Sequence, residues 1–256
     1  MKKTVIILMS IFLFSIGCEK ESIKSDKETL SELDLKVKEL GIEDEYTLEA
    51  IINNPNNSFE AAGILHNYGC DIINEKMEKY NFKSGFDKEV ICEIGYDLAK
   101  TMNMEIPNGF LKKIPFEKIL SKNSFISDES LDQYVKEGLI TENLKKCSIK
   151  LRESILQCFT LNEIQNKVIL LENEFLTDDS LSELEKEIIL SACAVARYSC
   201  AYWTSEGVID TSSKGRGLMV VITDAFGFVI GGTTGGIFGG GVGAVIASAL
   251  AAEATE

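Results

Sequence analysis

Apolar residues recur every three or four positions over most of this chain, and polar or glycine-containing breaks separate the periodic stretches. This spacing is typical of amphipathic α-helices, because residues three or four apart share one helix face. Strong stretches begin near Ser58, Phe86 and Thr141, and the most apolar one runs from Leu181 to Trp203. The three prolines all fall at breaks between stretches, where they interrupt no helix. The pattern predicts an all-α protein with the architecture of a multi-helix bundle.

Local signals place several helix boundaries. Short acidic helices are predicted over residues 30–40 and 46–52, and the asparagine-rich stretch 53–57 is predicted to be a loop. In a capping box, a Ser or Thr and a Glu three residues later bond each other's backbone N–H groups. This motif predicts that helices start at Thr160 and at Ser180.

Residues 217–252 carry the most unusual pattern in the chain, because Asp224 is their only formally charged residue. Small residues occupy every fourth position, which places them on one helix face and lets another helix approach closely. Each glycine weakens a helix by about 1 kcal/mol relative to alanine, so close packing has to compensate. The stretch is a glycine zipper whose helix-packing residues are Gly227, Gly231, Gly235, Gly239 and Gly243.

The middle of this segment predicts how it folds. Thr233 and Thr234 are flanked by glycine pairs, which is a favourable context for a turn. We therefore expect a C-terminal glycine-zipper helical hairpin, with two helices of about 15 residues meeting through their glycine faces.

The N-terminus has the features of a signal peptide. Lys2 and Lys3 precede the apolar run 5–16, which is too short to span a bilayer of about 30 Å. The sequence Ser15-Ile16-Gly17-Cys18 resembles a bacterial lipobox, although Ser15 replaces the usual leucine. The resemblance implies that Cys18 becomes the lipidated first residue, and Glu19 after it favours the outer membrane, with exposure at the cell surface as a further option. An ordinary signal peptide with an incidental cysteine is the alternative.

These observations divide the chain into four parts. They are a lipoprotein signal peptide (1–17), a flexible charged tether (18–30), a helical body (31–206) and the glycine-zipper hydrophobic segment (217–252).

Net charge and cysteine content restrict the partners and the compartment. The formal charge of −14 argues against nucleic acid, since phosphate binding requires clustered Lys and Arg. Beyond Cys18, six cysteines remain, which leaves both buried thiols and up to three disulfides open. Cys193 and Cys200 are not expected to pair with each other, because they are seven positions apart on one helix, or about 10 Å along its axis.

Candidate catalytic chemistry is sparse. His66, the only histidine, shares a helix face with Cys70 one turn later, which permits a Cys–His dyad or half of a metal site. A hydrogen-bonded histidine at the edge of the core is the favoured interpretation. No phosphate loop, nucleophile elbow or dinucleotide motif occurs, so we predict no catalytic residue, no metal site and no cofactor.

Arg197 interrupts the most apolar helix and therefore needs a partner, because an unpaired buried charge costs several kcal/mol. Asp71, Asp97 and Asp224 are the candidate partners. A buried ion pair between Arg197 and Asp224 would hold the zipper against the helical body. The alternative is an Arg197 side chain that reaches solvent from the helix edge.

Several short motifs together resemble a group of uncharacterised exported bacterial proteins with glycine-rich, bacteriocin-like tails. They are Asn54-Pro55, His66-Asn67, Ala196-Arg197-Tyr198-Ser199, Tyr202-Trp203 and the glycine-rich tail from Asp224. Because no activity of that group can be carried over, the resemblance supplies no catalytic residues for this chain.

Two functions remain open. The favoured one is a non-enzymatic, outer-membrane-anchored lipoprotein, a helical binding or structural module with the zipper packed in the body. Its membrane partner is reached through lipid on Cys18. The alternative is a membrane-active protein, similar to a toxin or pore, whose residues 217–252 insert and self-associate; their length favours insertion, and nine glycines among residues 225–243 oppose it.

Overall fold

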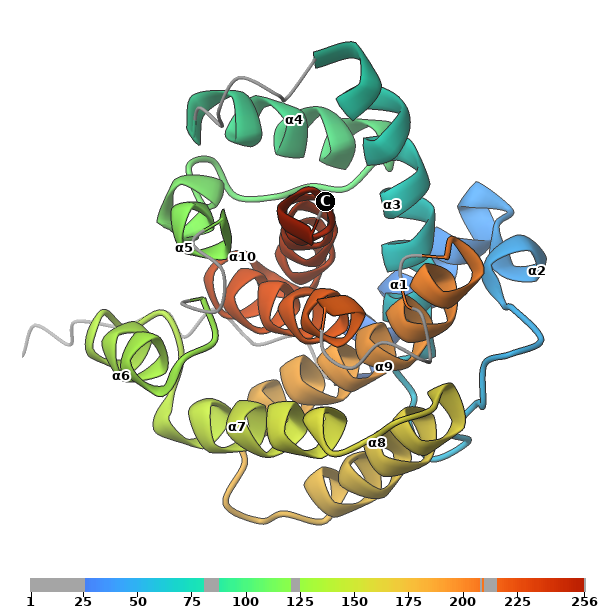
Figure 1. The fold of residues 1–256 in the computed structure, drawn as a ribbon, viewed down its shortest axis with the longest axis vertical. Helices are drawn as coiled ribbons and strands as arrows, with labels where there is room; N and C mark the ends of the chain where they lie inside the picture. Colours follow the sequence, from blue (N-terminus) through green and yellow to red (C-terminus); the bar gives the residue numbers. More distant parts are fainter. Residues whose placement is uncertain (1–25, 81–87, 121–124, 208, 210–215, 256) are drawn as a thin grey trace, which may run out of the picture.

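The computed structural model describes residues 26–80, 88–120, 125–207, 209 and 216–255. These residues form helices and no strand, which confirms the predicted all-α multi-helix bundle (Figure 1). The elements are α1 (Asp26–Leu40), α2 (Glu43–Tyr46), α3 (Glu60–Tyr80), α4 (Lys88–Thr101), η2 (Leu111–Lys113), α5 (Phe116–Leu120), α6 (Asp128–Lys136), α7 (Glu142–Leu156), α8 (Leu161–Leu176), α9 (Glu183–Ser205) and α10 (Arg216–Thr255).

The C-terminal element α10 lies at the centre of the bundle (Figure 1). It packs most extensively against α9 and α3, and it also contacts α4, α5 and α7. Most of its described side chains are buried, and they belong to a single hydrophobic core whose members lie between Leu33 and Ala251 in the sequence. The zipper and the helical body therefore share one core.

Two helical arms make up α10, because Gly236 interrupts the helix with φ +72° and ψ −175°. Only glycine adopts this conformation readily. The predicted turn at Thr233 and Thr234 is wrong, since both residues stay helical in the first arm. Their hydroxyls donate to the carbonyl oxygens of Val229 and Ile230 at 2.8 Å, which is a bond that threonine makes inside a helix. We call residues 216–235 the first arm and residues 237–255 the second arm.

The arms run antiparallel and touch through glycine. A Cβ added to Gly231 would collide with the carbonyl of Gly239, and one added to Gly227 would lie 2.6 Å from the carbonyl oxygen of Gly243. A step of four residues backward along the first arm, from Gly231 to Gly227, matches a step of four residues forward along the second arm, from Gly239 to Gly243, as antiparallel arms require. The predicted hairpin is therefore present, with its turn at Gly236.

Other boundaries differ from the predictions. Helix α1 begins at Asp26, so the last five residues of the predicted tether are helical, and residues 1–25 lie outside the described part. The stretch 46–52 is not a helix, because α2 ends at Tyr46.

The two capping boxes had different outcomes. The one at Thr160 is confirmed. The second is formed by Ser182 and Glu185 rather than by Ser180, which bonds Asp178 instead.

Candidate functional site

Buried polar side chains gather in two groups where sequence-distant helices meet. We call them the Asp224 cluster and the Arg197 cluster. The Asp224 cluster comprises His66, Cys70, Ser199, Trp203, Asp224 and Ser248. The Arg197 cluster comprises Asn54, Asn57, Glu60, Glu172 and Arg197.

The Asp224 cluster joins both arms of α10 to α3 and α9. One carboxylate oxygen of Asp224, Oδ2, accepts hydrogen bonds from Ser199 Oγ at 2.5 Å and from Trp203 Nε1 at 3.3 Å. Trp203 Nε1 also lies 3.1 Å from Ser248 Oγ on the second arm. His66 Nε2, from α3, is 3.5 Å from the same oxygen of Asp224. Four segments of the fold therefore meet at one carboxylate.

The hydrogen-bond network assigns the tautomer of His66. Asn67 donates its side-chain N–H to the carbonyl of Tyr198 at 3.3 Å, so its amide oxygen faces His66 Nδ1 at 3.1 Å. Nδ1 then carries the proton, and neutral His66 presents the Nε2 lone pair to Asp224. This geometry disfavours an ionised Asp224 beside a neutral His66.

Burial acts on both groups in the same sense, toward the uncharged form. It lowers the pKa of His66 to about 4, although the hydrogen bond to Asn67 opposes this change. It raises the pKa of Asp224 to about 7, against the hydrogen bonds from Ser199, Ser248 and Trp203. The other oxygen of Asp224, Oδ1, is buried without a hydrogen-bond partner, which a protonated carboxyl tolerates better than a carboxylate does.

The same geometry does not supply a Cys–His nucleophile. Cys70 Sγ lies 3.6 Å from His66 Nε2, and this nitrogen is also the one that faces Asp224. A catalytic triad needs the two ring nitrogens to serve the nucleophile and the carboxylate separately. Burial also raises the pKa of the Cys70 thiol well above its usual value, so the reactive thiolate is disfavoured. The cluster is better suited to holding α3, α9 and the two arms of α10 together than to catalysis.

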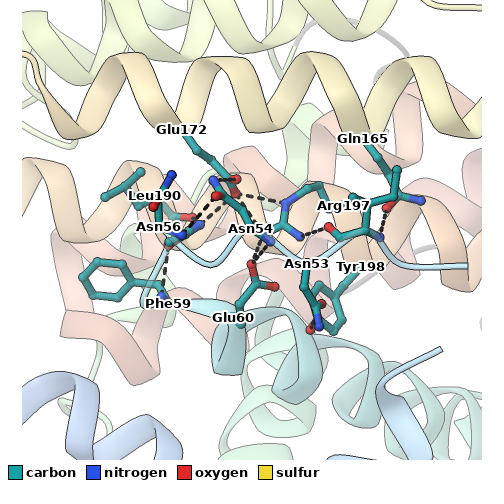
Figure 2. Close-up of polar contacts among 12 residues, drawn as sticks. Asn53, Asn54, Asn56, Phe59, Glu60, Gln165, Glu172, Leu190, Arg197 and Tyr198 are labelled. Atoms are coloured by element: carbon teal, nitrogen blue, oxygen red, sulfur yellow. Dashed lines mark hydrogen bonds and ion pairs between the residues drawn. The ribbon is translucent and has the colours of Figure 1, made fainter. Parts of the chain in front are cut away.

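The Arg197 cluster corrects one predicted contact (Figure 2). Arg197 does not pair with Asp224; its guanidinium bonds Glu172 at 3.0 Å and also bonds Glu60 and the carbonyl of Ile52. Arg197 is fully buried, so the interpretation in which it reaches solvent is also wrong. Burial alone would lower its pKa, but the carboxylates of Glu172 and Glu60 outweigh burial and raise it.

The cluster fixes the asparagine-rich loop onto the core. Asn54 and Asn57 each donate a side-chain N–H to Glu172 at 2.7 Å, as Figure 2 shows for Asn54. Beside them, Gln165 bonds the backbone N–H of Ile52 and the carbonyl of Ala50. The loop, α3, α8 and α9 are thereby held by one set of buried charges.

The sequence analysis identified neither Glu172 nor Glu60, the two carboxylates that pair with Arg197. Glu172 lies four residues after Val168 and three before Phe175, on the buried face of α8. The available signal was a single carboxylate on the apolar face of one helix, since α9 carries a single arginine, of opposite charge, on its own apolar face. Asp71, one of the candidate partners, instead accepts hydrogen bonds from Tyr46 and Tyr202.

The remaining predicted residues have clear outcomes where they are described. Gly227, Gly231, Gly239 and Gly243 pack arm against arm, whereas Gly235 lies against the ring of Phe110. The six cysteines after Cys18 are free and buried, so the thiol interpretation holds over the disulfide one. Among the residues that the structure describes, no group of His, Cys, Asp or Glu side chains is arranged to hold a metal ion. Cys18 and the signal peptide lie outside the described residues.

The short motifs that carry the resemblance meet in the fold. Asn54 and Arg197 both bond Glu172 in the Arg197 cluster, while His66, Ser199 and Trp203 surround Asp224. Comparison with protein-family models, with curated proteins and with solved structures found no match. The resemblance therefore stays a prediction.

Proposed function

We propose that this chain is a non-enzymatic lipoprotein of the outer membrane, tethered by lipid on Cys18, and that its helices form a binding or structural module. The N-terminal sequence supports this cellular location, because Lys2 and Lys3 precede a short apolar run that ends at a lipobox-like cysteine. The net charge of −14 supports a partner other than nucleic acid.

One observation carries the assignment of the tail to the module. The only element long and apolar enough to cross a membrane, among those described, is the segment Gly217–Ala252, and most of it is buried inside the bundle. Its one charged side chain, Asp224, is hydrogen-bonded to α9. Two acyl chains on Cys18 would anchor the protein stably without any help from this segment. The zipper then serves as the core around which the other helices pack.

Removing the tail tests this proposal. The chain without residues 1–18 should be a monomer in detergent-free buffer and should melt cooperatively, because the zipper is satisfied internally. Deletion of residues 217–256 should then abolish the cooperative transition, since α9 loses its main packing partner and α3 loses a large part of its packing surface. A chain that aggregates with the tail and becomes a folded monomer without it would refute the assignment.

Substitution of Cys18 separately tests whether lipid on this residue anchors the protein in the outer membrane. The Cys18→Ser variant should leave the outer-membrane fraction, while the folded helices keep their melting temperature. Retention of that variant in the membrane fraction would contradict lipid anchoring.

The segment Gly217–Ala252 also supports a second function, that of a membrane-active protein. Each arm of α10 is about 20 residues long, or about 30 Å at the rise of an α-helix, which matches the hydrocarbon core of a bilayer. In this function, α10 leaves the bundle and inserts. Leakage of a dye from lipid vesicles would support it, and intact vesicles under all conditions would oppose it.

A further inference from the structure

We propose that the α10 hairpin passes from the bundle into a lipid bilayer when the medium becomes acidic, and that protonation of His66 is the releasing event. The proposal rests on the second function above and adds its trigger.

The hairpin is built to leave as a unit. Its arms contact each other through Gly227, Gly231, Gly239 and Gly243, so their closest packing is internal to α10. Helix pairs in membranes pack in this way, through small residues that let backbones approach. Large apolar side chains such as Val245 and Ile246 face the surrounding helices instead, beside Gly69 of α3 and Gly95 of α4. Lipid could replace those helices without disturbing the contact between the arms.

The Asp224 cluster is the polar contact that such a departure must break. Ser199 and Trp203 on α9 and His66 and Cys70 on α3 are the protein groups that face Asp224 or its neighbour Ser248. Asp71, next to Cys70, is turned toward Tyr46 and Tyr202. Among the groups in contact with Asp224, only His66 gains a charge on acidification.

Asp224 itself contributes little to the pH response of this transfer. Burial in the bundle favours its protonated form, and burial in lipid favours the same form. Its proton is therefore retained in acid on either side of the transfer. Cys70 remains a neutral thiol in both states.

The pKa of His66 changes greatly, because the side chain remains on α3 and gains access to water when α10 leaves. Its pKa is about 4 in the bundle and 6.5 as its ordinary value. Acidification from well above pH 6.5 to well below about pH 4 should therefore shift the transfer equilibrium toward insertion by about 300-fold in total, which is ten to the power of the pKa difference.

The experiment uses the purified full-length protein, as the cell processes it, with vesicles of phosphatidylcholine and phosphatidylglycerol. Trp203 is the only tryptophan in the chain and contacts both arms of α10, so its emission reports release directly. We expect a shift in emission together with dye leakage as the pH falls toward about 4. The His66→Gln variant should lose most of this pH dependence. The control Ser191→Ala, which removes a buried hydroxyl without a hydrogen-bond partner on α9, should respond like the wild type.

The outcomes separate the trigger from the function. Wild-type protein that leaves vesicles intact at every pH would refute the membrane-active function as a whole. Insertion of His66→Gln with the wild-type pH midpoint would refute the trigger alone.

A second variant tests the release of the α10 hairpin even if His66→Gln does not fold at neutral pH. Ser248 Oγ lies 3.7 Å from Cys70 Sγ, so Ser248→Cys places two thiols side by side across the boundary between α10 and α3. The oxidised variant should be unable to release the hairpin and should regain leakage after reduction. Equal leakage from the oxidised and reduced forms would overturn the proposal.

Discussion

Removal of either member of the His66–Asp224 pair should reveal a pH dependence of stability that the intact pair hides. Asp224 has a raised pKa in the folded state, so its contribution is fully present below its unfolded pKa of 3.8 and is lost as the pH rises through about 7. His66 has a lowered pKa, so its contribution is present above 6.5 and is lost as the pH falls through about 4. The two effects have opposite signs over nearly the same interval.

Their sizes follow from the pKa differences. The free energy is about 1.4 kcal/mol for each unit of pKa, which gives about 4 kcal/mol for Asp224 and about 3 kcal/mol for His66. In the intact pair they cancel to within about 1 kcal/mol between about pH 4 and about pH 6.5. Acid should therefore have little effect on unfolding in water through this pair, which distinguishes unfolding from the proposed transfer to lipid.

Urea titrations followed by far-ultraviolet circular dichroism would measure these terms. Relative to the wild type, the free energy of unfolding of Asp224→Asn should increase by about 3 kcal/mol from about pH 4 to about pH 6.5, since the Asp224 contribution that falls over this interval is missing from this variant. That of His66→Gln should decrease by about 3 kcal/mol over the same interval, since the rising contribution of His66 is missing from this variant. Comparison with the wild type removes the contribution of the exposed carboxylates. The reasoning fails if both variants follow the wild-type pH profile.

Other contacts give equally direct predictions. Gly231→Ala should lower the free energy of unfolding by about 1–3 kcal/mol, because the added methyl group meets the facing arm. Gly241→Ala, where nothing lies within 4 Å, should raise it by up to about 1 kcal/mol, and equal effects in urea titrations would contradict the arm contact. Arg197→Met should cost about 3–5 kcal/mol by leaving Glu172 buried and unpaired, and adding Glu172→Leu should restore much of that loss in the same assay. The six buried cysteines should react with a thiol reagent only at the rate of unfolding, and rapid labelling of the native protein would show that they are accessible.

The periodic signals of the sequence were sufficient for the fold class and for the hairpin. Spacing of three and four determines which face of a helix is apolar, and spacing of four between glycines determines where backbones touch. The turn was misplaced because two threonines among glycines indicate a break, whereas in the folded hairpin their hydroxyls bond helical carbonyls and leave the break to Gly236. Glycine pairs on both sides of the threonines offered no local means of choosing between these turns.

The polar clusters were predictable only in part. The need of a buried Arg197 for a carboxylate could be inferred, although its apolar surroundings left open whether the side chain was buried or reached solvent. The identity of Glu172 could not, because the pairing depends on how α8 and α9 are positioned, and no local pattern encodes that arrangement. Asp224 and His66 were each recognised as unusual, but their contact joins residues far apart in the sequence and follows only from the packing of α10 against α3.

The central position of α10 has a consequence for the order in which the protein can fold. Its 40 residues follow the other described helices in the sequence, yet α9 uses them as its main packing partner and α3 packs against them as well. A chain emerging from the ribosome would therefore lack the middle of its core until α10 has been synthesised. Premature folding would therefore be suppressed over most of the described chain until α10 is available to complete the core.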